Sequence, residues 1–173
     1  GISGVHNSLQ ELYKSFNDLM EAFKTQLRYR VNFIVSECNS KRYGPAPLLS
    51  ATMDDCIESA QDISDGGCRY NYTGLWGSSI ANTTNALVAI KKLVYDERII
   101  SKKDILDALI NNYEGYEDLQ KIVTNKCPKF GQDNDYVDLI AKEIADYYAD
   151  IVSSCTNNYG DKYKASLASA WDY

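Results

Sequence analysis

The stretch that sets this sequence apart is DISDGGCRYNYTGLWGSS, residues 62–79. It holds four of the ten glycines of the chain, and aromatic residues alternate with small and polar ones around them. Glycine permits backbone conformations that other residues avoid, whereas alternating aromatic residues favour extended chain. The pattern predicts a turn that leads into one short strand or extended segment near residues 68–77.

Helical periodicity precedes this stretch. Ser8-Leu9-Gln10-Glu11 has the form of a capping box, and a long amphipathic helix is expected to follow it and to end in the late thirties, before Gly44. A coiled coil is an alternative, but a helix lying along a larger core explains the pattern. A second, shorter helix is expected over residues 48–60. The apolar residues of the long helix recur every three or four positions: Leu9, Leu12, Phe16, Leu19, Phe23, Leu27, Val31 and Ile34.

Four more helices are predicted after the stretch. The first covers residues 80–95, and the second is capped by Ser101. Gly115 ends it, a short helix follows through Leu119–Val123, and a last helix begins near Asp133. The sequence therefore predicts a mainly α fold. The buried stripe of the second helix is expected to be Ile105, Leu106, Leu109 and Ile110, and that of the last helix Val137, Ile140, Ile144, Tyr147 and Ile151.

Composition excludes several classes of function. The 173 residues carry a net charge of −6, and no Lys/Arg cluster is larger than a pair, so nucleic acid is not expected as a partner. No apolar run is long enough to span a bilayer, and Gly1–Asn7 lacks the features of a signal peptide. The absence of an initial Met and the ending at Tyr173 are interpreted as cuts within a longer protein.

Cysteine usage favours a reducing compartment. The five cysteines form no Cys-x-x-Cys pair, and their odd number does not suit a secreted disulfide framework. Glycosylation sequons at Asn71 and Asn82 argue weakly for secretion. A cytoplasmic location is expected, and the alternative of a secreted disulfide domain predicts that the cysteines are paired.

No motif in the chain assigns a catalytic residue or a metal site. His6 is the only histidine, so neither a zinc site nor a histidine-dependent nucleophile is supported. Asp133-Asn134-Asp135 departs from an EF-hand loop at its next positions. Asp54, Asp55 and Glu58 are interpreted as a solvated helix face or as partners of distant Arg and Lys side chains. Cys56 and Cys68 flank the glycine-rich turn and are interpreted as small apolar residues.

Six segments in a fixed order carry a family resemblance: PLLS (47–50), DDCIE (54–58), DGGCRYNYTG (65–74), LVAIKKLVY (87–95), EGYEDLQ (114–120) and KCPKFGQDNDYVD (126–138). In this order and spacing, residues 47–138 resemble the glycyl radical enzymes of the pyruvate formate-lyase-like superfamily, in the branch of dehydratases, lyases and decarboxylases. Residues 1–46 are similar to the helical region that precedes this match, and residues 139–173 to the helix and extension that follow. The whole chain is thus interpreted as one segment of the barrel domain.

The resemblance implies a parent enzyme with a ten-stranded α/β barrel and anaerobic radical chemistry on a small organic substrate. In this family a backbone glycyl radical oxidises the cysteine of a Gly-Cys-Val-Glu loop, and an iron–sulfur activase that uses S-adenosylmethionine installs the radical. The present sequence contains neither Gly-Cys-Val-Glu nor the Arg-Val-x-Gly-Tyr glycyl loop. The chain is therefore expected to be inactive alone, to hold no cofactor, and to need the remainder of its parent.

The turn from residue 65 to residue 71 is the candidate for approaching the barrel interior. The family usually has Glu-Gly-Gly-Ala where this chain has Asp-Gly-Gly-Cys, and the substrate-pocket candidates are Asp65, Cys68, Arg69, Tyr70 and Asn71. The alternative interpretation is that Arg69 and Asn71 only brace the loop.

The alternative function is a stand-alone helical interaction module, or a split or decayed relative of the family. A severed barrel segment should expose strand edges and apolar patches and tend to self-associate, whereas a module should have a closed polar surface.

Overall fold

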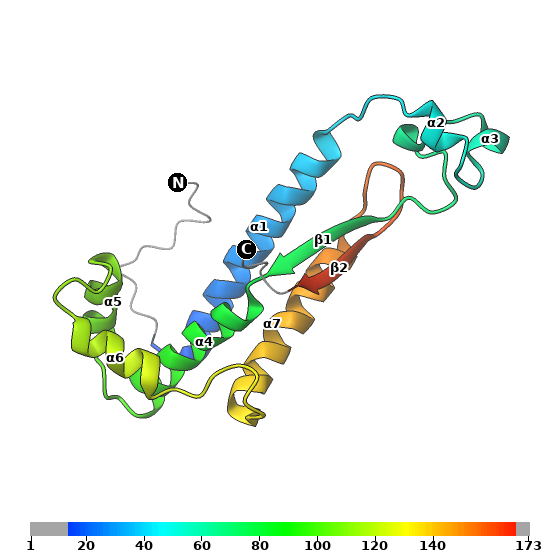
Figure 1. The fold of residues 1–173 in the computed structure, drawn as a ribbon. Coiled ribbons are helices and arrows are strands. Elements are labelled where there is room, and N and C mark those ends of the chain that lie inside the picture. Colours follow the sequence, from blue (N-terminus) through cyan, green and yellow to red (C-terminus); the bar gives the residue numbers. More distant parts are fainter. Residues whose placement is uncertain (1–13, 169–173) are drawn as a thin grey trace. The chain divides into compact units, whose positions relative to one another are not determined.

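The computed structural model of this chain describes residues 14–168 (Figure 1). These residues belong to two compact units. Of the described residues, the first unit contains 14–26, 78–147 and 167–168, and the second contains 27–77 and 148–166. Two long helices, α1 (Phe16–Ser40) and α7 (Asp135–Ser154), contribute residues to both units. No helix within the described range has the length and apolar character that crossing a membrane requires.

Helix α1 begins at a capping box that differs from the predicted one. The Ser15 hydroxyl accepts a 3.1 Å hydrogen bond from the backbone N–H of Asp18, and the Asp18 carboxylate accepts a 2.9 Å bond from the N–H of Ser15. The predicted box at Ser8–Glu11 and His6 lie outside the described residues. The expected end of the helix in the late thirties is confirmed, because α1 ends at Ser40.

The first unit has a core built mainly from helices, with Ile100 and Cys127 added from the connecting segments. It contains α4 (Ile80–Ile90), the π-helix η2 (Lys91–Asp96), α5 (Lys102–Ile110), α6 (Glu117–Asn125) and parts of α1 and α7. The predicted helix over residues 80–95 is therefore present, with its last turn widened into a π-helix. The core is made by Met20, Leu87, Val88, Ala89, Leu93, Val94, Ile100, Cys127, Val137, Ile140 and Ile144.

Helix α5 confirms its predicted cap and corrects its predicted buried stripe. The Ser101 hydroxyl accepts a 3.0 Å hydrogen bond from the backbone N–H of Asp104. Leu109 and Ile110 were expected to be buried but are 52% and 63% exposed, whereas Ala108 is fully buried. The apolar face of α5 is wider than the area that the other described residues cover. A periodic pattern shows that such a face exists, but it cannot show which part of the face is covered.

The second unit holds the glycine-rich stretch and several short elements. These are α2 (Pro47–Ser50), α3 (Cys56–Ser59), the 3₁₀ turn η1 (Ile63–Asp65), β1 (Thr73–Ser78) and β2 (Tyr163–Ala168). The prediction of one helix over residues 48–60 is wrong, because the chain turns between α2 and α3 and Asp55 adopts a left-handed φ of 72°. Long-range contacts impose this turn: Ser50 bonds to Asp62, while Cys56 lies against Cys68.

The two strands form a small sheet in which β1 and β2 run parallel, side by side (Figure 1). The strand predicted near residues 68–77 is confirmed as β1, whereas β2 was not predicted. The Leu75 carbonyl accepts bonds from the hydroxyls of Tyr148, at 3.0 Å, and Ser166, at 3.4 Å. Within residues 14–168 the sheet has two strands, so each strand has one edge without a neighbouring strand.

Candidate functional site

Two adjacent glycines shape the turn that the sequence singled out. Gly66 has a φ of +83°, and a Cβ atom there would come within 2.7 Å of the ring of Tyr159. A Cβ atom on Gly67 would meet the backbone oxygen of Gln61 at 2.2 Å, a distance that real contacts do not reach. The turn can therefore form only if both positions lack a side chain.

One carboxylate anchors the start of the turn. Asp62 accepts hydrogen bonds from the backbone N–H groups of Ala46, at 3.0 and 3.1 Å, and of Ser64, at 2.9 Å, and from the Ser50 hydroxyl at 2.8 Å. These donors, Ser64 foremost, stabilise the charged form and lower the pKa of Asp62 to about 2. Asp62 thereby fastens α2 to the segment that opens the turn.

Asn71 closes the turn. Its side-chain amide donates to the carbonyls of Gly66, at 3.2 Å, and Cys68, at 2.7 Å. Its backbone N–H donates to the Asp161 carboxylate at 2.9 Å, and its carbonyl accepts from the amide of Asn157. The turn is therefore held both from within and by residues almost ninety positions later in the chain.

The later segment is itself a tight turn, with the sequence Asn157-Asn158-Tyr159-Gly160-Asp161. The Asn157 side-chain oxygen accepts 3.0 Å bonds from the N–H groups of Tyr159 and Asp161, which is an Asx-type arrangement. The Tyr159 hydroxyl donates to the Ser64 carbonyl at 2.7 Å. Sequence reasoning missed these residues, although their Asn/Gly/Asp composition is a recognisable turn signal.

Arg69 points to α3 instead of along the turn. Its guanidinium makes a bidentate pair with Asp55, with both N–O distances at 2.7 Å. The pair lowers the pKa of Asp55 and raises the pKa of Arg69. Arg69 and Asn71 thus both make the contacts that the bracing interpretation expects.

A hollow of about 400 Å³ lies beside the turn. Of the five candidates, Cys68, Tyr70 and Asn71 line it together, while Asp65 and Arg69 do not. Its wall is rich in phenol rings: Tyr70 stacks on Tyr72 with ring centres 5.8 Å apart, and Tyr72 in turn lies under the Lys164 ammonium. The lining consists of Tyr43, Gly44, Ala46, Leu49, Ile63, Ser64, Cys68, Tyr70, Asn71, Tyr72, Thr73 and Tyr159.

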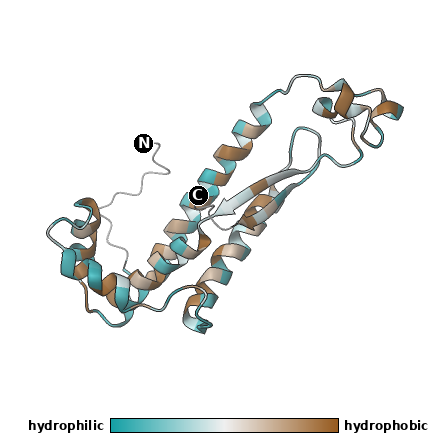
Figure 2. Ribbon diagram, viewed as in Figure 1, coloured by the Kyte–Doolittle hydropathy of each residue, from teal (hydrophilic) through white to brown (hydrophobic). Residues whose placement is uncertain are grey.

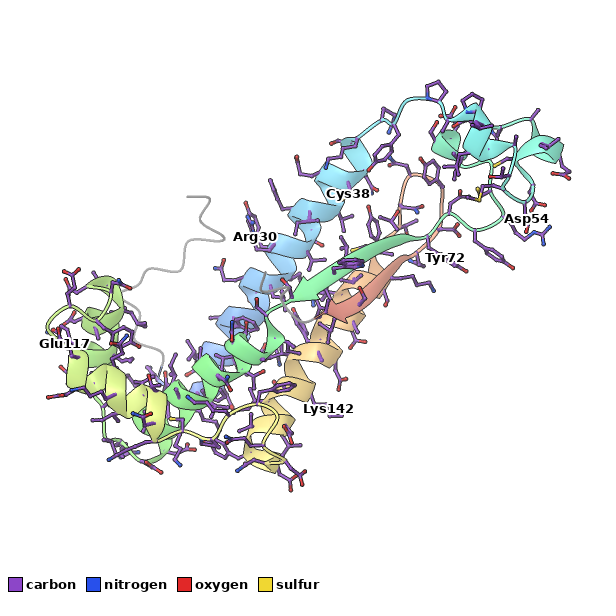
Figure 3. The ribbon with its side chains drawn as sticks, in the orientation of Figure 1. Arg30, Cys38, Asp54, Tyr72, Glu117 and Lys142 are labelled. Carbon is purple, nitrogen blue, oxygen red and sulfur yellow. The ribbon has the colours of Figure 1, made fainter. Side chains whose placement is uncertain are left out.

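Asp65 is exposed at the end of η1, and its carboxylate has no hydrogen-bond or ion-pair partner among residues 14–168. Side chains of the surrounding segment are drawn in Figure 3, where Tyr72 is labelled just before β1 and Asp54 beside α3. In the same described range, no three His, Cys, Asp or Glu side chains are grouped so that they could hold a metal ion. The hollow therefore offers phenols, one side-chain amide and one thiol, while the Asp65 carboxylate stands in the same turn outside the lining.

Comparison with known proteins places the chain in a family. The sequence model of the family described as pyruvate formate lyase-like matches residues 4–171. The trans-4-hydroxy-L-proline dehydratase of Clostridioides difficile is 36% identical over an alignment of 169 residues, and the match covers 95% of this chain and 21% of the relative. The (2S)-3-sulfopropanediol dehydratase of Klebsiella oxytoca is 28% identical over an alignment of 165 residues, and the match covers 92% of this chain and 20% of that protein.

Solved structures agree with the sequence relatives. The glycerol-bound B12-independent glycerol dehydratase of Clostridium butyricum has a TM-score of 0.83 and 34% identity, over 92% of this chain and 21% of that one. A glycyl radical enzyme of Archaeoglobus fulgidus has a TM-score of 0.82 and 34% identity, over 91% of this chain and 21% of that one. The chain spans about a fifth of the length of these relatives, and it belongs to the pyruvate formate lyase-like family of glycyl radical enzymes.

Proposed function

We propose that this chain is a segment of an anaerobic, cytoplasmic glycyl radical enzyme that removes or cleaves a group on a small organic substrate. The observation that carries the proposal is the family match over residues 4–171 in a chain that spans a fifth of its relatives. Those relatives are dehydratases and lyases that act on small molecules, as their names state.

The exposed apolar surface supports a segment over a self-contained interaction module. Leu48 on α2 and Ile57 on α3 are 84% and 67% exposed, and Trp76 on β1 is 74% exposed. Figure 2 shows hydrophobic residues in brown along α2 and α3 and on both long helices. A soluble monomer rarely leaves so many large apolar side chains uncovered, and the open sheet edges point the same way. In this proposal the remainder of the parent enzyme covers them.

The groups that carry the radical belong, in this proposal, to the remainder of the parent. The sequence contains neither of the two loops that hold the thiyl and glycyl groups in the family. The described cysteines do not offer a substitute, because Cys56 and Cys127 are only 3% and 6% exposed and none of the five is followed by Val-Glu. A separate activase would supply the radical to that remainder, and the isolated 173 residues would turn over no substrate.

The contribution of this chain would be one wall of the substrate pocket. A hollow of about 400 Å³ lies within the range of pockets that bind small molecules, and it is lined by Cys68, Tyr70 and Asn71. Asp65 lies in the same turn but outside this lining, and in this proposal it would add a carboxylate to the complete pocket of the parent. Arg69 would hold the turn against α3 through Asp55. The Asn71 bonds within the turn would keep this wall rigid, because a positioned wall orients substrate better than a mobile one.

Asp65 provides the test. In the full-length parent, activated without oxygen by its own activase, Asp65→Asn keeps the size of the side chain and removes its charge. If the carboxylate faces substrate, kcat/KM should fall by about tenfold or more, the loss typical of one charged contact. Asp54→Asn is the matched control, since Asp54 is an exposed carboxylate of the same unit. Equal kinetics for the two variants would reject a pocket role for Asp65.

A second measurement tests the proposal as a whole. The isolated 173 residues should show no turnover with the activase and any substrate of the parent, and adding the remainder of the parent should be required for activity. Turnover by the isolated chain would contradict the assignment of the radical groups to the remainder.

A further inference from the structure

Two thiols are in contact at the back of the turn. The Sγ atoms of Cys56, the first residue of α3, and Cys68 lie 3.5 Å apart. Among residues 14–168 no other pair of cysteine sulfurs is in contact, and the Cys155 thiol instead donates to the Ile151 carbonyl. Such a contact between thiols in a chain with five scattered cysteines is a specific feature of this fold.

The backbone around the two thiols is held in place. Asn71 donates to the Cys68 carbonyl, the Ser59 hydroxyl donates to the Gly67 carbonyl, and Arg69 is paired with Asp55 next to Cys56. A disulfide needs a sulfur–sulfur distance near 2.0 Å, so the two atoms must approach by about 1.5 Å. We expect rotation of the two side chains to supply a movement of this size while the hydrogen bonds of the turn are kept.

We propose that Cys56 and Cys68 form a reversible disulfide in the presence of a small-molecule disulfide such as oxidised glutathione. Cys68 reacts first, because it is half-buried and lines the hollow, whereas Cys56 is 3% exposed. The Cys68 thiolate attacks one sulfur of the oxidant, the oxidant's S–S bond breaks, and one reduced thiol leaves. Cys56 then attacks the Cys68 sulfur, the mixed disulfide breaks, and the second reduced thiol leaves with the second proton.

The order of attack follows from the surroundings of the two thiols. Burial, together with the neighbouring Cys68 thiol, raises the pKa of Cys56 to about 11, so Cys56 is a poor first nucleophile. Once Cys68 is part of a mixed disulfide, it no longer carries the thiol that helps to raise the pKa of Cys56. The two sulfurs also already lie in contact. This inference is independent of the proposed function, because it concerns only thiols within the chain.

The sequence makes the disulfide easy to detect. No Lys or Arg lies between residues 43 and 68, so trypsin releases Tyr43–Arg69 as one peptide that contains Cys56 and Cys68 and no other cysteine. The reduced 173-residue chain is incubated with oxidised glutathione, quenched with acid, alkylated in denaturant and digested. The disulfide leaves this peptide two hydrogens lighter and alkylated at neither cysteine, while the peptides with Cys38, Cys127 and Cys155 stay alkylated.

The decisive comparison is with the same chain in urea. Residues 12 positions apart also meet in an unfolded chain, so the folded chain must form the disulfide faster, by about tenfold or more, for the contact to matter. An equal rate in urea, a stable glutathione adduct on Cys68, or earlier cross-linking of Cys38 or Cys155 would each overturn the proposal.

Variants and a second probe keep the test independent of folding. Phenylarsine oxide binds two thiols that lie together, so it should bind the chain, and Cys68→Ala and Cys56→Ala should each abolish binding. Cys155→Ser should retain it, because Cys155 is a half-buried cysteine of the same unit outside the pair. Equal binding by Cys68→Ala and Cys155→Ser, with unchanged circular dichroism, would show that the arsenical does not bridge Cys56 and Cys68.

Discussion

The side-chain amide of Asn157 donates a 2.5 Å hydrogen bond to the backbone carbonyl of Asn71, 86 residues earlier in the chain. The same amide lies 3.2 Å from the Thr73 hydroxyl, and the Asn157 oxygen holds its own turn through two N–H groups. Asn157 itself is 7% exposed, so its side chain is largely shielded from water. This side chain fastens the C-terminal turn to the wall of the hollow.

Replacing Asn157 should therefore loosen both turns. Asn157→Ala removes several hydrogen bonds and leaves the Asn71 carbonyl without this donor, which should cost about 2–3 kcal/mol of unfolding free energy. Urea unfolding measures the loss, and hydrogen exchange should quicken at the backbone N–H of Asn71. Asn32→Ala, an exposed position on α1 in the same unit, is the control. Equal losses of unfolding free energy in the two variants would show that Asn157 does not have this structural role.

Asp62 should make the stability of the second unit depend on acid pH. Its folded pKa of about 2 lies below the unfolded value of about 4, so its stabilising effect is complete above pH 4 and is lost as the pH falls from about 4 to about 2. The difference in unfolding free energy between wild type and Asp62→Asn should shrink over this range. Urea titrations at pH 6, 4 and 2.5 (values chosen to bracket roughly this window) measure it.

The control for Asp62 is another carboxylate of the same unit. Asp54→Asn changes an exposed group and should follow wild type at each pH. A difference between wild type and Asp62→Asn that stays constant from pH 6 to pH 2.5 would mean that the hydrogen bonds to Asp62 do not depend on its charge.

Gly67 should tolerate no side chain. Alanine at this position would place Cβ 2.2 Å from the Gln61 oxygen, so the turn must shift, at a cost of about 3 kcal/mol, the upper end of overpacking effects. Gly44→Ala is the matched control, since a Cβ atom at position 44 would meet no other atom within 4 Å. Urea unfolding should show a large loss for Gly67→Ala and a change below about 1 kcal/mol for Gly44→Ala. Similar stabilities would mean that the turn is looser than described.

Thr84 offers a stabilising substitution. Its hydroxyl is fully buried in α4 and has no hydrogen-bond partner among the described residues. Thr84→Val keeps the shape and removes the unpaired polar atom, which should raise the unfolding free energy by about 1 kcal/mol. Thr83→Val, at the half-buried neighbouring position, corrects for the change in helix propensity. A Thr84→Val chain that is no more stable than Thr83→Val would indicate that a water molecule satisfies the hydroxyl.

Only one part of the candidate site, the turn at residues 65–71, can be predicted from the sequence. Asp-Gly-Gly at residues 65–67 indicates a turn in any fold, because the positive φ of Gly66 and the close approach of Gly67 need residues without side chains. The five candidate residues were chosen from that turn, and three of them line one hollow. Tyr43, Asn157, Tyr159 and Asp161 come from distant segments, and nothing in the turn itself points to them.

The sequence by itself determined the local elements of this protein. The end of α1 before Gly44, the Ser101 cap of α5 and the break at Gly115 follow from interactions between residues a few positions apart. The position of strand β1 follows from the alternation of aromatic and small residues in its own segment. Only the tertiary structure decided the division of residues 48–60 into α2 and α3, the pairing of β2 with β1, and the exposure of Leu109 and Ile110. These features depend on partners outside the local segment, such as Asp62 for Ser50, 12 residues away, and Asn157 for Asn71, 86 residues away. Periodicity reports which faces are apolar, but the folded chain determines what covers them.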